Sequence, residues 1–317
     1  MALFFIVRFL CPRSIVPACL VALIHIPGFY SIFYSRALLS EAVTTFLLCW
    51  SFFFFTWAMH GVSRAAPILG GAGFGLVVLS RPEYAPFVLI LSAILWFRKR
   101  GAAGGKNALR PVGIFLLAAS LVVLPWTARN FYVFKKPILV TVGGGVNIFL
   151  GTIESKSNWT GWGEFPDDAF VNAEEKKRIM TLYDAHIRNT MIGGIEVMET
   201  DAALFRLGLE RIKKYPGKVL HLWFEKIPRL WYQDYVAKYR DQEASGLIFI
   251  LYFIFALVAF FTSHGQERLS LMPFAAIFVY LTLFFLPMQI EPRYAVASIP
   301  IIRCLTAIGI AKVFRWA

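Results

Sequence analysis

Long blocks of apolar residues, interrupted only by short loops, restrict most strongly what this chain can fold into. A window of about 19 residues places apolar spans near 14–34, 38–59, 66–80, 84–97, 111–126, 246–263, 270–288 and 294–313. A helix that crosses a bilayer needs about 20 such residues and satisfies its own backbone hydrogen bonds. The pattern therefore predicts an all-α polytopic membrane protein with about eight transmembrane helices, two of them short for a crossing.

The net charge of +13 is spread unevenly over the ends of these spans. If successive spans alternate in direction, the short loops of one side hold only Arg36, Arg81 and Arg293. The other side holds Arg8, Arg13, Arg64, Arg98, Lys99, Arg100, Lys106, Arg110, Arg268, Lys312 and Arg315. Basic loops face the cytoplasm, so the charge indicates topology and argues against a nucleic-acid partner.

This topology predicts three regions: an N-terminal transmembrane block (1–126), an exported loop region (127–244) and a C-terminal block of three transmembrane helices (245–317). The exported region should be partly helical, with an irregular loop at its start and an amphipathic helix along the bilayer interface near its end. The compact loops and short chain favour a bacterial inner membrane. The glycine-rich stretch GGAGFG at 70–75 lies inside a span, where small residues let helices pack closely.

A small polar set collects at the exported ends of the spans. It comprises Glu41, Arg81, Glu83, Arg129, Asn130, Glu291, Arg293 and Tyr294. Any one of these could simply reach the lipid headgroups, but together they suit a phosphate. Two arginines near the bilayer surface could hold the phosphate of a lipid whose tail stays in the membrane. A neighbouring carboxylate could act as a base or help to hold a divalent metal. The set predicts group transfer from a lipid phosphate.

Two further polar residues lie within predicted spans. His25 is expected to be packed or to face a cavity rather than to be a ligand. Arg303 lies near the middle of the last span, where a charge is costly and usually faces a partner or water. The sequence contains no HExxH, paired CxxC, GxSxG or Walker lysine, so zinc protease, serine hydrolase and P-loop ATPase lose their main support.

The stretch 124–152, LPWTARNFYVFKKPILVTVGGGVNIFLGT, resembles the segment that follows a membrane helix in polytopic GT-C glycosyltransferases. That group includes the protein O-mannosyltransferases and aminoarabinose transferases. The similar motifs are Pro-Trp at 125–126, Arg-Asn at 129–130 and Gly-Gly-x-Asn at 144–147. LLSEAVTTFLL, VVLSRPEYAP, YPGKVLHLWFEKIPRLW and EPRYAVASIP are also similar to segments of this family, so the resemblance covers nearly the whole chain. The Pro-Trp pair is expected to end the helix at the interface.

The resemblance implies transfer of a sugar from a polyprenyl-phosphate donor to a lipid, glycan or protein acceptor at the exported face. It implies that Arg81, Arg293 and Tyr294 hold the donor phosphate. Of the two catalytic candidates, Glu41 would orient the acceptor or a metal, and Glu83 would position Arg81. The residues expected to shape the loop are Arg129, Asn130 and Asn147, whose amide suits loop backbone or sugar hydroxyls. Whether a divalent metal is bound stays open.

Family members begin with a further span and an exported loop whose acidic residue is thought to activate the acceptor. Here no Asp precedes Asp167, so we expect the chain to lack that amino-terminal span and loop. Two alternatives therefore stay open beside the enzyme. One is a transporter or lipid flippase, for which Arg303 is the best support, although no internal repeat is visible. The other is a non-catalytic homologue that binds or assembles with a partner.

Overall fold

A computed structural model describes residues 1–25, 40–103, 105–153, 173–192, 196–231, 242–291 and 293–316. These residues form helices and turns without any strand, which confirms the predicted all-α class. The helices are α1 (Ala2–Leu10), α2 (Val16–His25), α4 (Ser40–His60), α5 (Ala66–Ser80), η1 (Pro82–Tyr84), α6 (Ala85–Ala103), α7 (Gly105–Phe134), α8 (Gly144–Gly151), α9 (Ala173–Ile192), α10 (Glu196–Lys214), α11 (Pro216–Trp231), α12 (Gln242–Thr262), α13 (Gly265–Phe285), α14 (Arg293–Val296) and α15 (Ile299–Val313).

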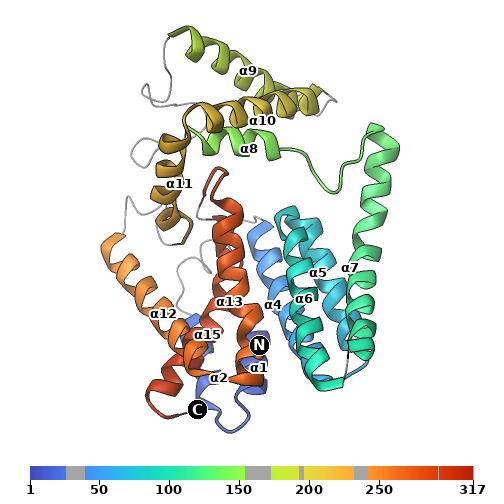
Figure 1. The fold of residues 1–317 in the computed structure, drawn as a ribbon, viewed down its shortest axis with the longest axis vertical. Coiled ribbons are helices and arrows are strands. Elements are labelled where there is room, and N and C mark those ends of the chain that lie inside the picture. The colour runs from blue at the N-terminus through green and yellow to red at the C-terminus, as the bar shows by residue number, and fades with distance from the viewer. Residues whose placement is uncertain are drawn as a thin grey trace.

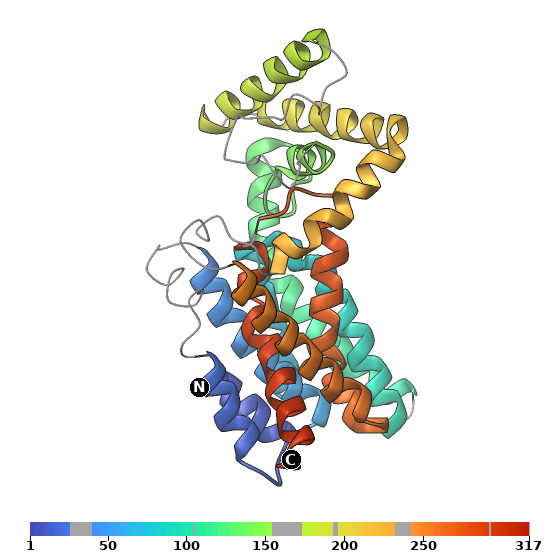
Figure 2. The same ribbon diagram turned by 90° about the vertical axis from the view of Figure 1, so that its left-hand side faces the viewer.

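Three helical segments are long and apolar enough to cross a membrane: α4, residues 108–134 of α7, and α13. Three shorter apolar helices accompany them: α2, α5 and residues 246–262 of α12. The fold is therefore that of a helical membrane protein, while the count of eight spans stays a prediction. Helices α8 to α11 gather at one end of the bundle (Figures 1 and 2). Most of the predicted irregular loop, 154–172, lies outside the described residues.

Helix α7 does not end where the sequence predicts. Pro125 and Trp126 lie inside it, and the helix continues to Phe134. A proline removes one backbone hydrogen bond, but membrane helices tolerate it where neighbouring groups compensate. The extension is held by the returning chain, because the Trp126 indole Nε1 donates a hydrogen bond to the Val140 carbonyl oxygen at 3.1 Å. The predicted helix end at 125–126 is thus wrong, and the region boundary at 126 falls inside a helix.

Helix α5 packs between α4 and α7 through its glycines. A Cβ atom at Gly71 would overlap the backbone carbonyl of Phe115 on α7, and one at Gly75 would lie 2.8 Å from the Ala119 carbonyl oxygen. On the side of α4, a Cβ at Gly73 would overlap a serine side chain. These distances confirm helix packing as the role of the glycine-rich stretch 70–75.

Replacing Gly71 with alanine is expected to destabilise the bundle by about 1–3 kcal/mol, because α5 and α7 must separate to admit the methyl group. Gly113→Ala on α7 is the matched control, since no atom lies within 4 Å of the added Cβ. Chemical denaturation of the protein in detergent, followed by circular dichroism, would compare the two free energies of unfolding. Equal values for the two variants would contradict the close packing.

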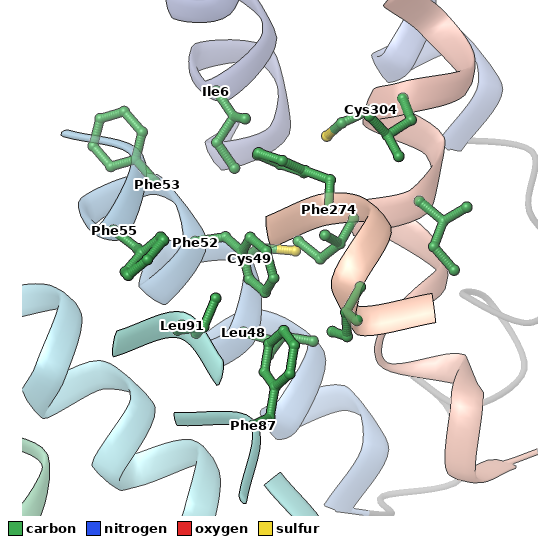
Figure 3. Packing of buried hydrophobic residues seen from close by; sticks show 14 of the residues in the cluster. Ile6, Leu48, Cys49, Phe52, Phe53, Phe55, Phe87, Leu91, Phe274 and Cys304 are labelled. Carbon is green, nitrogen blue, oxygen red and sulfur yellow. The ribbon is translucent and has the colours of Figure 1, made fainter. Parts of the chain in front are cut away.

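Aromatic rings hold the middle of the bundle together. The ring of Phe52 on α4 is fully buried, with its centroid 5.5 Å from Phe74 of α5, 6.2 Å from Phe87 of α6 and 5.3 Å from Phe274 of α13. Figure 3 shows part of this packing. Ring pairs at such separations stabilise beyond the burial of their area. The cluster therefore fixes the positions of four helices whose ends carry the polar residues.

Among the described residues, the two sets of charged loop residues lie at opposite ends of the bundle, and Arg36 lies outside the described residues. At one end of the bundle, Arg98 Nη1 donates a hydrogen bond to the Gln266 carbonyl oxygen at 2.8 Å, and Lys312 Nζ lies 2.6 Å from Glu267 Oε1. These contacts join the ends of α6 and α15 to the start of α13. The acidic and arginine set lies at the other end, where α4 starts and α5 ends.

Candidate functional site

Local sequence places three predicted site residues at the end of the bundle nearest α8 to α11. Glu41 lies in the first turn of α4, where a carboxylate is favoured by the helix dipole. Arg81 follows α5 with an extended backbone (φ −147°), because Pro82 disfavours helical geometry at the preceding residue. Glu83 lies in the short helix η1 that Pro82 begins. The turn therefore points an arginine and a carboxylate toward the start of α4.

Arg81 lies between two carboxylates. Its Nη2 forms a hydrogen-bonded ion pair with Glu41 Oε1, and its Nη1 lies 3.4 Å from Glu83 Oε1. The Glu41 side chain is only 2% exposed, and its Oε2 has no hydrogen-bond partner among the described residues. A charge buried in a protein requires a paired opposite charge. The Arg81 guanidinium supplies that charge for Glu41, and Glu83 lies within ion-pair distance of the same guanidinium.

The second arginine reaches the same place from the C-terminal part of the chain. Arg293 Nε lies 2.5 Å from Glu291 Oε2, but off the line of a hydrogen bond, and its side chain is 36% exposed. The guanidinium carbons of Arg81 and Arg293 both lie 5.7 Å from the ring centre of Tyr294. The two guanidinium groups are therefore no further apart than twice that distance.

The charges of this cluster do not favour an anion as they stand. Glu41, Glu83 and Glu291 oppose Arg81 and Arg293, which leaves a net charge of −1 when all five are ionised. A phosphate therefore needs a carboxylate to be displaced or protonated, or a cation to accompany it. Glu83 is the best candidate for protonation, because burial raises its pKa by more than the nearby Arg81 lowers it. Both arginines are thus already engaged, which the sequence does not reveal.

A cavity of about 210 Å³ lies between α8, α9 and the segment that contributes Gln289, Glu291, Arg293 and Tyr294. Asn147 of α8 lines it, and its side-chain amide makes no hydrogen bond within the described parts of the chain. His186 of α9, only 4% exposed, also lines it, with Nδ1 3.1 Å from Thr200 Oγ1. Burial lowers the pKa of His186, so its imidazole is neutral at pH 7. The lining suits an uncharged hydroxyl-bearing group more than a second anion.

Arg129 and Asn130 lie apart from the Arg81 cluster. The Asn130 amide is buried and donates a hydrogen bond to the Val140 carbonyl oxygen at 3.1 Å, while Arg129 Nη1 donates to Asn130 Oδ1 at 3.1 Å. The Arg129 guanidinium also packs 4.9 Å from the Trp126 ring. These contacts fold the chain back along the end of α7. Trp126, Arg129 and Asn130 line a second cavity, of about 310 Å³. This cavity shares Val142, Thr190 and Val197 with the first one.

Helix α8 is anchored at its start by Asp201 of α10, a residue that the sequence did not single out. The carboxylate accepts hydrogen bonds from the backbone N–H groups of Gly145 (3.1 Å) and Val146 (2.9 Å). Free N–H groups at a helix start are satisfied in this way, and the helix dipole adds to the attraction. A Cβ at Gly145 would overlap the Asp201 backbone, which explains one glycine of the triple.

Lys226 of α11 anchors the other end of α8. Its side chain is 1% exposed, and Nζ donates hydrogen bonds to the carbonyl oxygens of Gly151 (2.9 Å) and Met288 (3.0 Å). The sequence carried a signal for this role, because Lys226 shares a helical face with the buried Val219 and Leu222. A lysine on an apolar face indicates a buried charge that needs acceptors.

The two polar residues predicted inside the membrane spans contact each other. Arg303 Nη1 lies 3.0 Å from His25 Nδ1, and Arg303 is 8% exposed. The sequence predicted a partner for Arg303 without identifying it.

In the described parts of the chain, no group of three or more His, Cys, Asp or Glu side chains could hold a metal ion.

Together, fold and site define a helical membrane protein with an ion-paired cluster and an adjoining cavity at one end of its bundle. Comparisons of the chain with protein-family models, with curated proteins and with solved structures gave no match.

Proposed function

We propose that this chain is a GT-C-type glycosyltransferase of the bacterial inner membrane. It would transfer a sugar from a polyprenyl-phosphate donor to a lipid, glycan or protein acceptor at the exported face. The observation that carries the proposal is the meeting of Arg81 and Arg293 beside one ring, Tyr294, where the apolar helices end. The motif resemblance of the sequence points to the same reaction.

In this reaction a hydroxyl or amine of the acceptor bonds to the sugar anomeric carbon and gives its proton to a carboxylate of the cluster. The bond between that carbon and the donor phosphate oxygen breaks, and the leaving polyprenyl phosphate gains a negative charge. Donors that meet this charge lower the barrier. Arg293 is the more available of the two arginines, because its side chain is 36% exposed and that of Arg81 is 14% exposed. Arg81 would supply the second cation and is held by its ion pair with Glu41, the candidate for orienting the acceptor. The 210 Å³ cavity would take the sugar ring.

Arg293→Gln is expected to lower turnover about 100-fold to 1000-fold, as for loss of one transition-state donor. The assay measures transfer of radiolabelled sugar from a polyprenyl-phosphate donor into the acceptor fraction of membranes that contain the full chain. Arg206→Gln is the matched control, since Arg206 is exposed on α10 and, among the described residues, bonds only within its own helix. Equal turnover in both variants would remove Arg293 from the reaction. Translocation of the lipid without a covalent product would support a flippase.

Binding of the donor is expected to tighten as the pH falls, because of Glu83. Its pKa is raised, so Glu83 becomes neutral at a higher pH than an ordinary glutamate, which removes one negative charge and releases Arg81 Nη1. Equilibrium dialysis of the donor, a phosphodiester, between about pH 5 and 8 would measure this trend. Glu83→Gln should bind tightly across the range and lose the pH dependence. An unchanged slope in that variant would assign the titration to another group.

A further inference from the structure

A larger cavity, of about 780 Å³, lies at the opposite end of the bundle from the candidate site. It is bordered by residues 10–14 of the α1–α2 turn, by Val258 and Thr262 near the end of α12, by Glu267, and by the end of α15. The turn and the C-terminal end lie next to each other in Figure 2. This is the end that carries the basic residues, which the sequence predicts to face the cytoplasm.

The cavity carries an excess of positive charge. Lys312 is engaged, because its Nζ lies 2.6 Å from Glu267 Oε1 and 2.7 Å from Ser263 Oγ. Arg13 and Arg315 also line the cavity, and the described residues offer their side chains no hydrogen bond or ion pair. Three cations against one carboxylate leave a net charge of +2. Arginine side chains present a planar fork that matches a phosphate.

The backbone holds Arg315 at an unusual position. Helix α15 ends in a Schellman-type pattern, with the Trp316 N–H donating to the Ala311 carbonyl oxygen (2.7 Å) and the Arg315 N–H donating to the Lys312 carbonyl oxygen (3.2 Å). The residue at this place adopts a left-handed conformation, and here its φ is +58°. Glycine is usual there because a side chain is disfavoured. The fold therefore keeps an arginine at the edge of the cavity where glycine would fit more easily.

The rim of the cavity is apolar. Val313 and the stacked rings of Phe314 and Trp316, 5.0 Å apart, are all exposed. The neighbouring face of α12 exposes a stripe of large apolar side chains: Ile250, Leu251, Ile254, Leu257 and Phe261. Tryptophan favours the level of the lipid headgroups, and aliphatic side chains below it face the acyl chains. A molecule with a charged head and an apolar body fits this combination.

We infer that this cavity binds the phosphate headgroup of an anionic phospholipid of the bilayer, with its acyl chains along the exposed face of α12. Basic pockets between membrane helices bind such headgroups, and each arginine near the surface strengthens the attraction. The lipid binds at the end of the bundle remote from Arg81 and Arg293, so the inference does not depend on sugar transfer.

Native mass spectrometry of the full chain in detergent, with phosphatidylglycerol competing against phosphatidylcholine, tests the site. Removing both cations in Arg13→Gln/Arg315→Gln should weaken phosphatidylglycerol binding by about 25-fold, or about fivefold for each arginine. Arg64→Gln is the matched control, because Arg64 is exposed among the basic loop residues but does not line the cavity. Equal binding in the wild type and both variants, or equal losses in both variants, would overturn the inference.

A variant that binds the lipid more tightly cannot be explained by misfolding, so it complements the variants that lose binding. Glu267→Gln releases Lys312 and raises the net charge of the cavity, so phosphatidylglycerol should bind about fivefold more tightly. Inorganic phosphate at the concentration of the lipid should not compete, since it lacks the chains that α12 would contact. Full competition by inorganic phosphate would identify a free-phosphate site and contradict the lipid. Unchanged or weaker lipid binding in Glu267→Gln would also count against it.

Discussion

Replacing Arg81 with methionine is expected both to slow sugar transfer by at least about 100-fold and to destabilise the bundle. The guanidinium pairs with Glu41, whose side chain is only 2% exposed. Removing one partner of a buried ion pair costs about 3–5 kcal/mol, because the other charge is left unpaired. Transfer should fall by about 100-fold to 1000-fold, since Arg81 no longer stabilises the negative charge on the leaving phosphate. Unfolding in denaturant and turnover with the polyprenyl-phosphate donor would measure the two effects.

The double variant Arg81→Met/Glu41→Gln separates the two effects. Glu41→Gln removes the buried charge that Arg81→Met leaves unpaired, so most of the lost stability should return. Turnover should not return, because no cation replaces Arg81 and the Glu41 carboxylate proposed to orient the acceptor is also absent. Arg81→Lys is the conservative comparison, since it keeps the charge but cannot reach Glu41 and Glu83 with a planar fork. If turnover recovers together with stability in the double variant, Arg81 has a structural role only.

The sequence predicts most helices because apolar blocks and their breakers are local signals. The span predicted at 66–80 is the helix α5, which ends before Arg81-Pro82. The amphipathic stretch before the last spans is α11, which begins at Pro216. Proline fixes both boundaries, since it begins helices readily and disfavours helical geometry at the preceding residue. These elements need no knowledge of tertiary contacts.

The end of α7 shows where local signals fail. Pro125 indicates a helix end, yet the helix continues to Phe134 because Trp126, Thr127 and Asn130 all bond to the chain that returns along it. The sequence contains those donors but does not state that their acceptors lie alongside. A tertiary contact therefore overrides the local preference, as it often does for helix propensity.

The sequence predicts which residues of the candidate site lie at the same end of the bundle, but not which of them form contacts. Alternation of the spans brings Glu41, Arg81, Glu83 and Arg293 to one end of the bundle, and this needs only topology. Whether an arginine there is free or paired depends on separations of a few ångströms, such as the 3.4 Å between Arg81 and Glu83. Topology does not specify these distances. The net charge of −1 is known only once the structure shows which carboxylates and guanidinium groups belong to the cluster.

Lys226→Met is expected to loosen the candidate site without touching its charges. The ammonium group joins α11 to the carbonyl oxygens of Gly151 and Met288, and the next backbone N–H, that of Gln289, donates to the Asn147 carbonyl oxygen at 2.8 Å. Loss of Nζ leaves two carbonyls without this donor, at about 1–3 kcal/mol for each buried group. Residues 288–291 lead directly to Arg293, so its position beside Tyr294 should become less defined. Transfer should fall together with stability.

Hydrogen exchange distinguishes an anchoring role from a direct one. In Lys226→Met, backbone amides of α8 and of residues 288–291 should exchange faster than in the wild type, because local opening costs less. Lys218→Met on the exposed face of α11 is the matched control and should leave this protection unchanged. Lys226→Arg keeps a donor and should recover part of the protection. If Lys226→Met lowers transfer while exchange in both segments stays the same, the lysine must act on the substrate itself, and α8 must be held by the Asp201 contacts at its start.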